Sequence, residues 1–182
     1  MIYVTGDMHG DFSRFKDSPL KKLKAGDTLL VCGDFGFIWD GSRLEQKLLK
    51  KIGNLKYNVA LQKKKYQILF VDGPHENFDL LEEYDVTEWN GGQVHHICGN
   101  LYHLMRGEIY EIEGERIFAF GGGHSGDFDI RRDTDNWWER EQPSYDEIMH
   151  AVETLGNADN AVDFIITHEP PASLKDCLNV DT

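Results

Sequence analysis

The stretch Ile2-Tyr3-Val4-Thr5-Gly6-Asp7-Met8-His9-Gly10 joins a short apolar run directly to a carboxylate and an imidazole. The apolar run has the length of a buried strand, and the glycines at 6 and 10 allow the backbone to turn sharply around the polar side chains. Asp7 and His9 lie two residues apart, so in an extended segment they project to the same side and can bind one metal ion. The stretch therefore predicts a strand that ends in metal ligands.

Three further apolar runs end in the same way, in an aspartate or a histidine. They are Thr28–Cys32 before Gly33-Asp34, Gln67–Val71 before Asp72-Gly73-Pro74-His75-Glu76, and Phe164–Thr167 before His168. In open α/β sheets, ligands bind beyond the carboxyl ends of the strands, where side chains far apart in sequence can meet. A single Gly-Asp pair is usually only a turn, but four junctions of one chemical type predict a shared metal site.

The composition is that of an ordinary globular protein. The 182 residues suffice for one well-buried domain and are too few for two, so we expect a single domain over residues 1–182. We expect a cytoplasmic location, because no apolar run approaches the roughly 20 residues of a membrane span and no signal sequence precedes the first strand. The three cysteines lack CxxC spacing and are expected to be buried thiols.

The formal net charge of -13 bears on the partners. Nonspecific binding to nucleic acid depends on Lys and Arg that replace phosphate counterions, so the acidic balance argues against it and against an anionic membrane surface. Two lysine-rich runs, at 21–24 and 63–65, are most simply solvated surface. An acidic protein that handles phosphate needs bound cations to offset its own charge, and the Asp and His side chains are suited to hold them.

The first half of the chain alternates between strand and helix patterns. Apolar spacing predicts a short helix after the first junction, interrupted by Pro19, and a longer one that starts at the capping box of Ser42 and Glu45 and extends toward Leu55. A third helix is expected over residues 76–84. This order predicts parallel strands joined by right-handed crossovers.

From residue 93 to residue 120 the pattern changes to short strands with close turns. Four strands are expected, over residues 94–97, 101–105, 108–112 and 116–120. Turn residues between them predict an antiparallel meander that forms a second sheet or extends the first. A further helix is expected to begin at Ser144, with Glu147 as its capping partner, and to end near Gly156.

The order of these motifs resembles that of the calcineurin-like metallophosphoesterases. Gly6-Asp7-Met8-His9-Gly10 is similar to that family's GDxHG motif, and Gly33-Asp34 with Gly36 is similar to its second motif. Gly73-Pro74-His75-Glu76 stands where GNHE is expected, and Thr167-His168 is similar to a later histidine motif. The resemblance covers nearly the whole chain. It implies an α/β fold, a two-sheet αββα sandwich with mixed sheets, and we expect its C-terminal part to be incomplete.

The resemblance also implies roles for individual residues. Asp7 and His9 would bind a first metal ion, Asp34 would bridge two ions, and His168 would bind the second. His75 would be catalytic, contacting the substrate phosphate and protonating the leaving group. Two divalent metal ions are implied, with Mn first and Fe or Zn as alternatives. The substrate would be a phosphorylated protein, a nucleotide or a small phosphate ester.

Two departures from the family's motifs lead us to expect a weakened site. Pro74 stands where the family has an asparagine ligand, and proline has no side-chain donor atom. The family's final GHxH motif, which supplies one histidine to each metal, is not found, because no histidine follows His168. The second metal would keep only Asp34 and His168 unless a side chain at 72, 76 or 77 substitutes. A truncated or altered form of a longer enzyme is the simplest hypothesis.

His124, Arg131 and Arg132 are further candidates for binding the substrate phosphate. His124 lies in the glycine-rich loop 121–127, which can approach a phosphate, and arginine can pair bidentately with phosphate oxygens. The alternative for these residues is a surface loop or an internal salt bridge.

The sequence leaves two functions open. The first is metal-dependent hydrolysis of phosphate esters by a dinuclear site, weakened by the two departures. The alternative is a catalytically impaired module that binds metal or phosphate and acts through a partner. A nucleic-acid phosphodiesterase is disfavoured by the negative charge.

Overall fold

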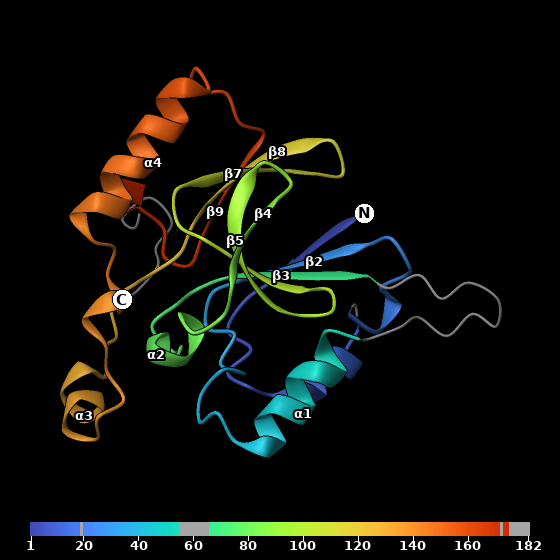
Figure 1. Cartoon of the computed structure of the whole chain (residues 1–182), viewed down its shortest axis with the longest axis vertical. Helices are drawn as coiled ribbons and strands as arrows, with labels where there is room; N and C mark the ends of the chain where they lie inside the picture. Colours follow the sequence, from blue (N-terminus) through green and yellow to red (C-terminus); the bar gives the residue numbers. More distant parts are fainter. Residues whose placement is uncertain (19, 55–65, 172, 175–182) are drawn as a thin grey trace.

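The strands form two sheets that face each other (Figure 1). The computed structural model describes residues 1–18, 20–54, 66–171 and 173–174. The first sheet contains β1 (Ile2–Thr5), β2 (Thr28–Cys32), β3 (Gln67–Val71), β4 (Val86–Trp89), β5 (Gly92–Cys98) and β6 (Leu101–Leu104). The second contains β7 (Glu108–Ile112), β8 (Glu115–Phe120) and β9 (Phe164–Thr167). Their strand orders are β1-β2-β3-β6-β5-β4 and β7-β8-β9.

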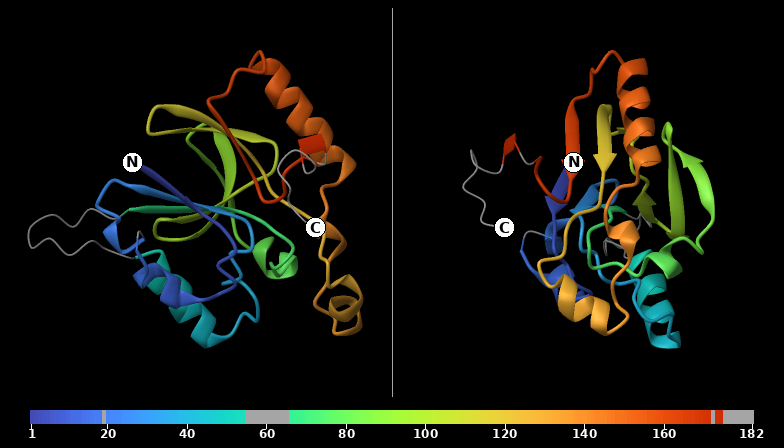
Figure 2. Two further views of the ribbon diagram at one scale, coloured as in Figure 1. Left: turned by 180° about the vertical axis from the view of Figure 1, so that it is seen from behind. Right: turned by 90° about the vertical axis from the view of Figure 1, so that its left-hand side faces the viewer.

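The described residues form four helices. They are α1 (Arg43–Ile52), α2 (Phe78–Leu81), α3 (Phe128–Asp133) and α4 (Tyr145–Asn157), with 3-10 turns at Phe12–Lys16, Leu20–Lys22 and Glu139–Glu141. Figure 2 shows α1 on the side of the first sheet that faces away from β7 and β8, and α4 on the far side of the second sheet. The layers therefore follow the expected αββα order.

Alternation along the central strands explains the layers, because successive side chains of a strand point to opposite faces. In β2, Leu29 and Val31 pack with Leu49 and Ile52 of α1, whereas Leu30 faces the second sheet. All five side chains are almost fully buried. Two apolar cores result, one under α1 and one between the sheets.

The predicted strands β1, β2, β3 and β9 are confirmed, and β1, β2 and β3 pair in parallel as expected. The prediction of an antiparallel meander over residues 93–120 is wrong in part. β6 pairs with β3 in parallel, so β4, β5 and β6 extend the first sheet. The turn at Arg106-Gly107 then sends the chain into β7 of the second sheet, and β8 pairs with β9 in parallel.

The helix predictions hold with changes. The capping box at Ser144 and Glu147 is confirmed. At α1, Ser42 accepts a hydrogen bond from the Glu45 N–H, but the Glu45 carboxylate reaches further back, to the N–H groups of residues 39–41. The helix ends at Ile52, and the expected extension to Leu55 lies outside the described residues. Where the first helix was expected, the chain forms two 3-10 turns instead.

No helix among the described residues has both the length and the apolar character needed to cross a membrane. Cys32 and Cys98 are half-buried and form no disulfide within the described part of the chain. Cys177 and the lysine run 63–65 fall outside that part.

Candidate metal centre

The loops that follow β1 and β2 lie side by side at the carboxyl edge of the first sheet. The Asp7 N–H donates to the Gly33 carbonyl (3.1 Å), and the His9 N–H donates to the Asp34 carbonyl (2.9 Å). Asp7, His9 and Asp34 have positive φ angles of 51°, 45° and 49°. Residues other than glycine rarely adopt this conformation, and such strain clusters at functional sites. Gly33 also has a positive φ, and a Cβ there would overlap the ring of His168.

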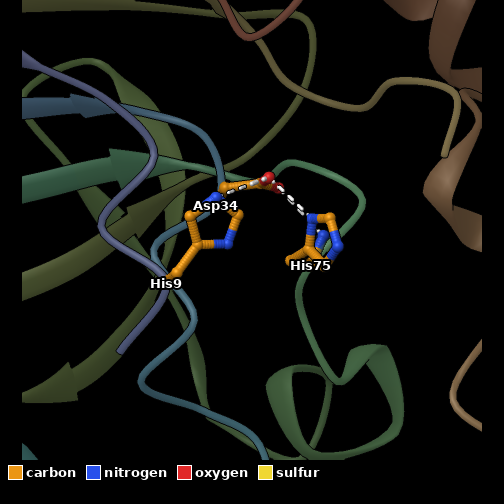
Figure 3. A group of neighbouring side chains, drawn as sticks. All are labelled: His9, Asp34 and His75. Atoms are coloured by element: carbon orange, nitrogen blue, oxygen red, sulfur yellow. Dashed lines mark hydrogen bonds and ion pairs between the residues drawn. The ribbon is translucent and has the colours of Figure 1, made fainter. Parts of the chain in front are cut away.

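Asp34 lies at the centre of the site, with its buried carboxylate facing three imidazoles. In Figure 3 its carboxylate approaches His75, whose Nδ1 lies 2.7 Å from Oδ2. The backbone N–H of His75 donates to Oδ1 at 2.9 Å. His9 Nε2 lies 3.7 Å from Oδ2, and His168 Nε2 lies 3.8 Å from Oδ1. Both carboxylate oxygens thus face histidine nitrogens, as a bridging ligand requires.

Two groups of three side chains can each bind a cation. Asp7, Asp34 and His168 form one group, and His9, Asp34 and His75 form the other. In each group the ligand atoms lie within 4.8 Å of one another. Asp34 belongs to both groups. Imidazole and carboxylate donors suit Mn, Fe and Zn, so the side chains fit two divalent cations that share Asp34.

One hydrogen bond orients the ring of His168. Its Nδ1 lies 2.9 Å from the carbonyl oxygen of Cys32, at the end of β2. A carbonyl oxygen only accepts, so Nδ1 carries a hydrogen, and Nε2 is the ring nitrogen that faces Asp34. A metal-binding histidine is commonly fixed through its other nitrogen in this way.

The same contacts shift the pKa values of the site. Burial raises the pKa of Asp34, but the hydrogen bonds from the His75 ring and backbone, together with the charge of His168, outweigh burial and lower it overall. The hydrogen bond to Asp34 raises the pKa of His75, against the opposing effect of burial.

Glu76 supports the site without belonging to either ligand group. Its fully buried carboxylate accepts the N–H groups of Phe35 (2.6 Å) and Gly36 (3.2 Å), and so holds the loop that follows Asp34. Burial raises the pKa of Glu76 well above its ordinary value. Sequence reasoning treated this residue only as a possible replacement ligand. Its partners lie far away along the chain, and the only local signal was its place next to His75.

The other two suggested replacement ligands are also occupied elsewhere. Asp72 is buried against Arg106 and His103, and the side chain of Asn77 accepts the Leu80 N–H as the N-cap of α2. Within the described residues, neither belongs to a group that could hold an ion. The structure separates Asp7 and His9, which were expected to bind the same ion. His168 joins Asp7 and Asp34 in one group, and His75, which was predicted to be catalytic, joins His9 and Asp34 in the other.

The three predicted phosphate-binding residues lie outside both groups. His124 is exposed, and its backbone N–H donates to Glu169 (2.6 Å). Arg132 is exposed and pairs with two neighbouring aspartates of α3. Arg131 is buried in an ion pair with Glu141 (2.6 Å), which matches the alternative of an internal salt bridge.

The chain was compared with models of known protein families. The family model described as calcineurin-like phosphoesterase matches residues 1–180. The chain belongs to this family. Searches of curated proteins and of solved structures found no match. The two-sheet fold agrees with the metallophosphoesterase fold, and the family match identifies a domain of the metal-dependent phosphoester hydrolase type.

Proposed function

We propose that this calcineurin-like phosphoesterase hydrolyses phosphate esters at a dinuclear site centred on Asp34. One observation carries the proposal: Asp34 belongs to both ligand groups, and its two oxygens face different histidines. A pair of divalent cations there would activate water and stabilise the charge that develops on a transferring phosphoryl group. Asp7 and His168 would hold one cation, and His9 would hold the other, with Asp34 shared.

His75 is proposed as the proton donor to the leaving group. Asp34 holds it through both the ring Nδ1 and the backbone N–H, so Nε2 lies on the side of the ring away from Asp34. That nitrogen is 3.7 Å from Asp127 Oδ2, on the exposed rim formed by the loop before α3. A donor fixed on one nitrogen and open on the other has the geometry that general-acid catalysis needs.

We also propose the identity of the bound metal, the class of substrate and the cellular location. Mn is the preferred cation, with Fe or Zn as alternatives that the donor set also suits. The substrate is a phosphorylated protein, a nucleotide or a small ester, with His124 and Arg132 as candidate contacts on the exposed rim. The half-buried thiol of Cys32 is compatible with a reducing compartment such as the cytoplasm.

A second candidate function is favoured by Pro74, which offers no side-chain ligand atom. In this alternative, the chain binds a cation or phosphate and acts through a partner without turnover.

The test is hydrolysis of p-nitrophenyl phosphate and bis-p-nitrophenyl phosphate with added Mn²⁺, by the natural chain and by Asp34→Asn. Asp146→Asn is the matched control, because Asp146 is exposed on α4. Turnover that disappears in Asp34→Asn and persists in Asp146→Asn supports the proposal, and the preferred ester gives the substrate class. The binding-module alternative predicts no turnover above that of Asp34→Asn.

A further inference from the structure

Three buried polar side chains lie together in the segment that runs from the glycine-rich loop to the turn before α4. They are Ser125, Arg131 and Glu141, with exposed fractions of 4%, 5% and 1%. Next to them on α3, Ile130 is 71% exposed, so this segment buries its polar side chains and exposes an apolar one. Buried polar side chains are stable only when other polar groups bind them, so the contacts of these three residues need an explanation.

The three side chains contact each other in a closed triangle. Arg131 Nη2 lies 2.6 Å from Glu141 Oε1, and the Ser125 hydroxyl donates to Glu141 Oε2 at 2.9 Å. Arg131 Nη1 donates to the Ser125 hydroxyl oxygen. A buried ion pair is a weak source of stability, because desolvation offsets most of the attraction between the charges.

The guanidinium also reaches the loop that carries His75. Arg131 Nη2 donates to the carbonyl oxygen of Pro74 at 2.8 Å and to that of Asn136 at 2.7 Å. The Pro74 carbonyl and the His75 N–H belong to one peptide group, and that N–H donates to Asp34 Oδ1 at 2.9 Å. A peptide group is planar, so fixing its oxygen on one side and its N–H on the other fixes its orientation.

We infer that Arg131 is a positioning residue for His75, acting through the peptide group between Pro74 and His75. The inference rests on the proposed function, in which His75 protonates the leaving group. The guanidinium is a rigid, planar set of donors that reaches the Ser125 hydroxyl and the Pro74 carbonyl together while its charge lies beside Glu141, which a lysine ammonium cannot reproduce. Arg131 therefore acts from inside the protein, without touching the substrate.

The test uses Arg131→Lys, which keeps a positive charge opposite Glu141 and so avoids leaving a buried charge unpaired. Ser125→Ala, which removes two of the three contacts in the triangle, is the second variant and tests the inference if Arg131→Lys does not fold. Arg140→Lys is the matched control: it is the same change in the same segment, at an arginine that is 42% exposed and pairs at the surface with Asp79 and Glu82.

The first readout is independent of activity. Ring ¹⁵N and ¹H NMR signals of the histidines are recorded on the metal-free protein. Arg131→Lys is expected to move the His75 signals and to leave those of His150, far along α4, in place. Unchanged His75 signals in both Arg131→Lys and Ser125→Ala overturn the inference, whether or not the natural chain is an enzyme.

The second readout compares two esters with Mn²⁺. A poorly placed proton donor slows hydrolysis most for phenyl phosphate, because its leaving group needs a proton. Hydrolysis of p-nitrophenyl phosphate depends less on the proton donor. We expect kcat on phenyl phosphate to fall about tenfold to a hundredfold, with a much smaller fall on p-nitrophenyl phosphate. In a His75→Asn background, Arg131→Lys should cause no further loss. Equal losses on both esters, or an added loss in that background, contradict the inference. An inactive natural chain refutes the proposed function instead and leaves the NMR result to decide on Arg131.

Discussion

The buried ion pair between Asp72 and Arg106 allows a quantitative prediction. Asp72 is 1% exposed and receives Arg106 Nε at 3.0 Å and Nη2 at 2.5 Å, with His103 Nε2 at 3.1 Å. Burial raises the pKa of Asp72, but the charges and hydrogen bonds of Arg106 and His103 together outweigh burial and hold this pKa well below its usual range. The carboxylate is therefore charged in the folded protein and depends on Arg106.

The change Arg106→Met leaves that carboxylate buried with only His103 beside it. Removing one partner of a buried pair costs about 3–5 kcal/mol. For a chain of this length, each kcal/mol lowers Tm by about 2–4 °C, so the expected fall in Tm is roughly 6–20 °C. Arg140→Met is the control, because an exposed pair contributes about 0–1 kcal/mol.

Thermal unfolding at pH 7, followed by circular dichroism, measures these changes. The double variant Asp72→Asn with Arg106→Met removes the stranded charge and should regain a large part of the lost Tm. The reasoning is refuted if Arg106→Met loses no more than Arg140→Met, or if the double variant is as unstable as Arg106→Met alone.

Two further predictions concern pH and helix capping. Burial lowers the pKa of His95 to about 4 in the folded chain, whereas its value in the unfolded chain is near 6.5. Between these two pH values the unfolded chain binds a proton at His95 that the folded chain does not. The free energy of unfolding therefore falls as the pH drops from about 6.5 toward 4. At pH 5 the loss in free energy of unfolding amounts to about 2 kcal/mol. Urea unfolding at pH 7 and pH 5 should therefore show a smaller difference in stability for His95→Gln than for the natural chain. Ser144→Ala removes the cap of α4 and should cost about 1 kcal/mol, whereas Ser144→Asp should keep most of the stability; equal urea midpoints for the two variants would contradict the capping role.

The strand ends were predictable because their signal is local. Each of β1, β2, β3 and β9 is a short apolar run followed at once by a polar ligand candidate. Parallel pairing brings the ends of β1, β2 and β3 to one edge of the first sheet, whereas β9 belongs to the second sheet and its His168 contacts the end of β2 from there. The shared position of Asp34 follows from two such ends being neighbours, since β1 pairs with β2. Local pattern and fold agree at these positions.

Sheet membership was not predictable, because pairing partners are far apart in sequence. Nothing local to Leu101–Leu104 shows that this strand pairs in parallel with β3 instead of forming a hairpin with β7. β4 was missed because Val86–Trp89 is largely exposed at the edge of the sheet and has no apolar alternation. The chain changes sheets at a turn that looks like any hairpin turn.

The supporting residues of the site were missed for a related reason. The sequence suggested Glu76 only as a replacement ligand, and Arg131 as a phosphate contact or part of an internal salt bridge. Both side chains are buried against partners distant along the chain. A buried charge becomes recognisable only when its partners are placed around it.

Sharing of Asp34 by two cation sites is best tested by the number of Mn²⁺ ions that the metal-free chain binds in calorimetry. We expect two ions for the natural chain, the second bound more weakly, and a loss of affinity at both sites in Asp34→Asn. The change Asp7→Asn should weaken only one of them. An Asp34→Asn chain that keeps one site at its natural affinity would contradict the account, because Asp34 would then serve a single ion.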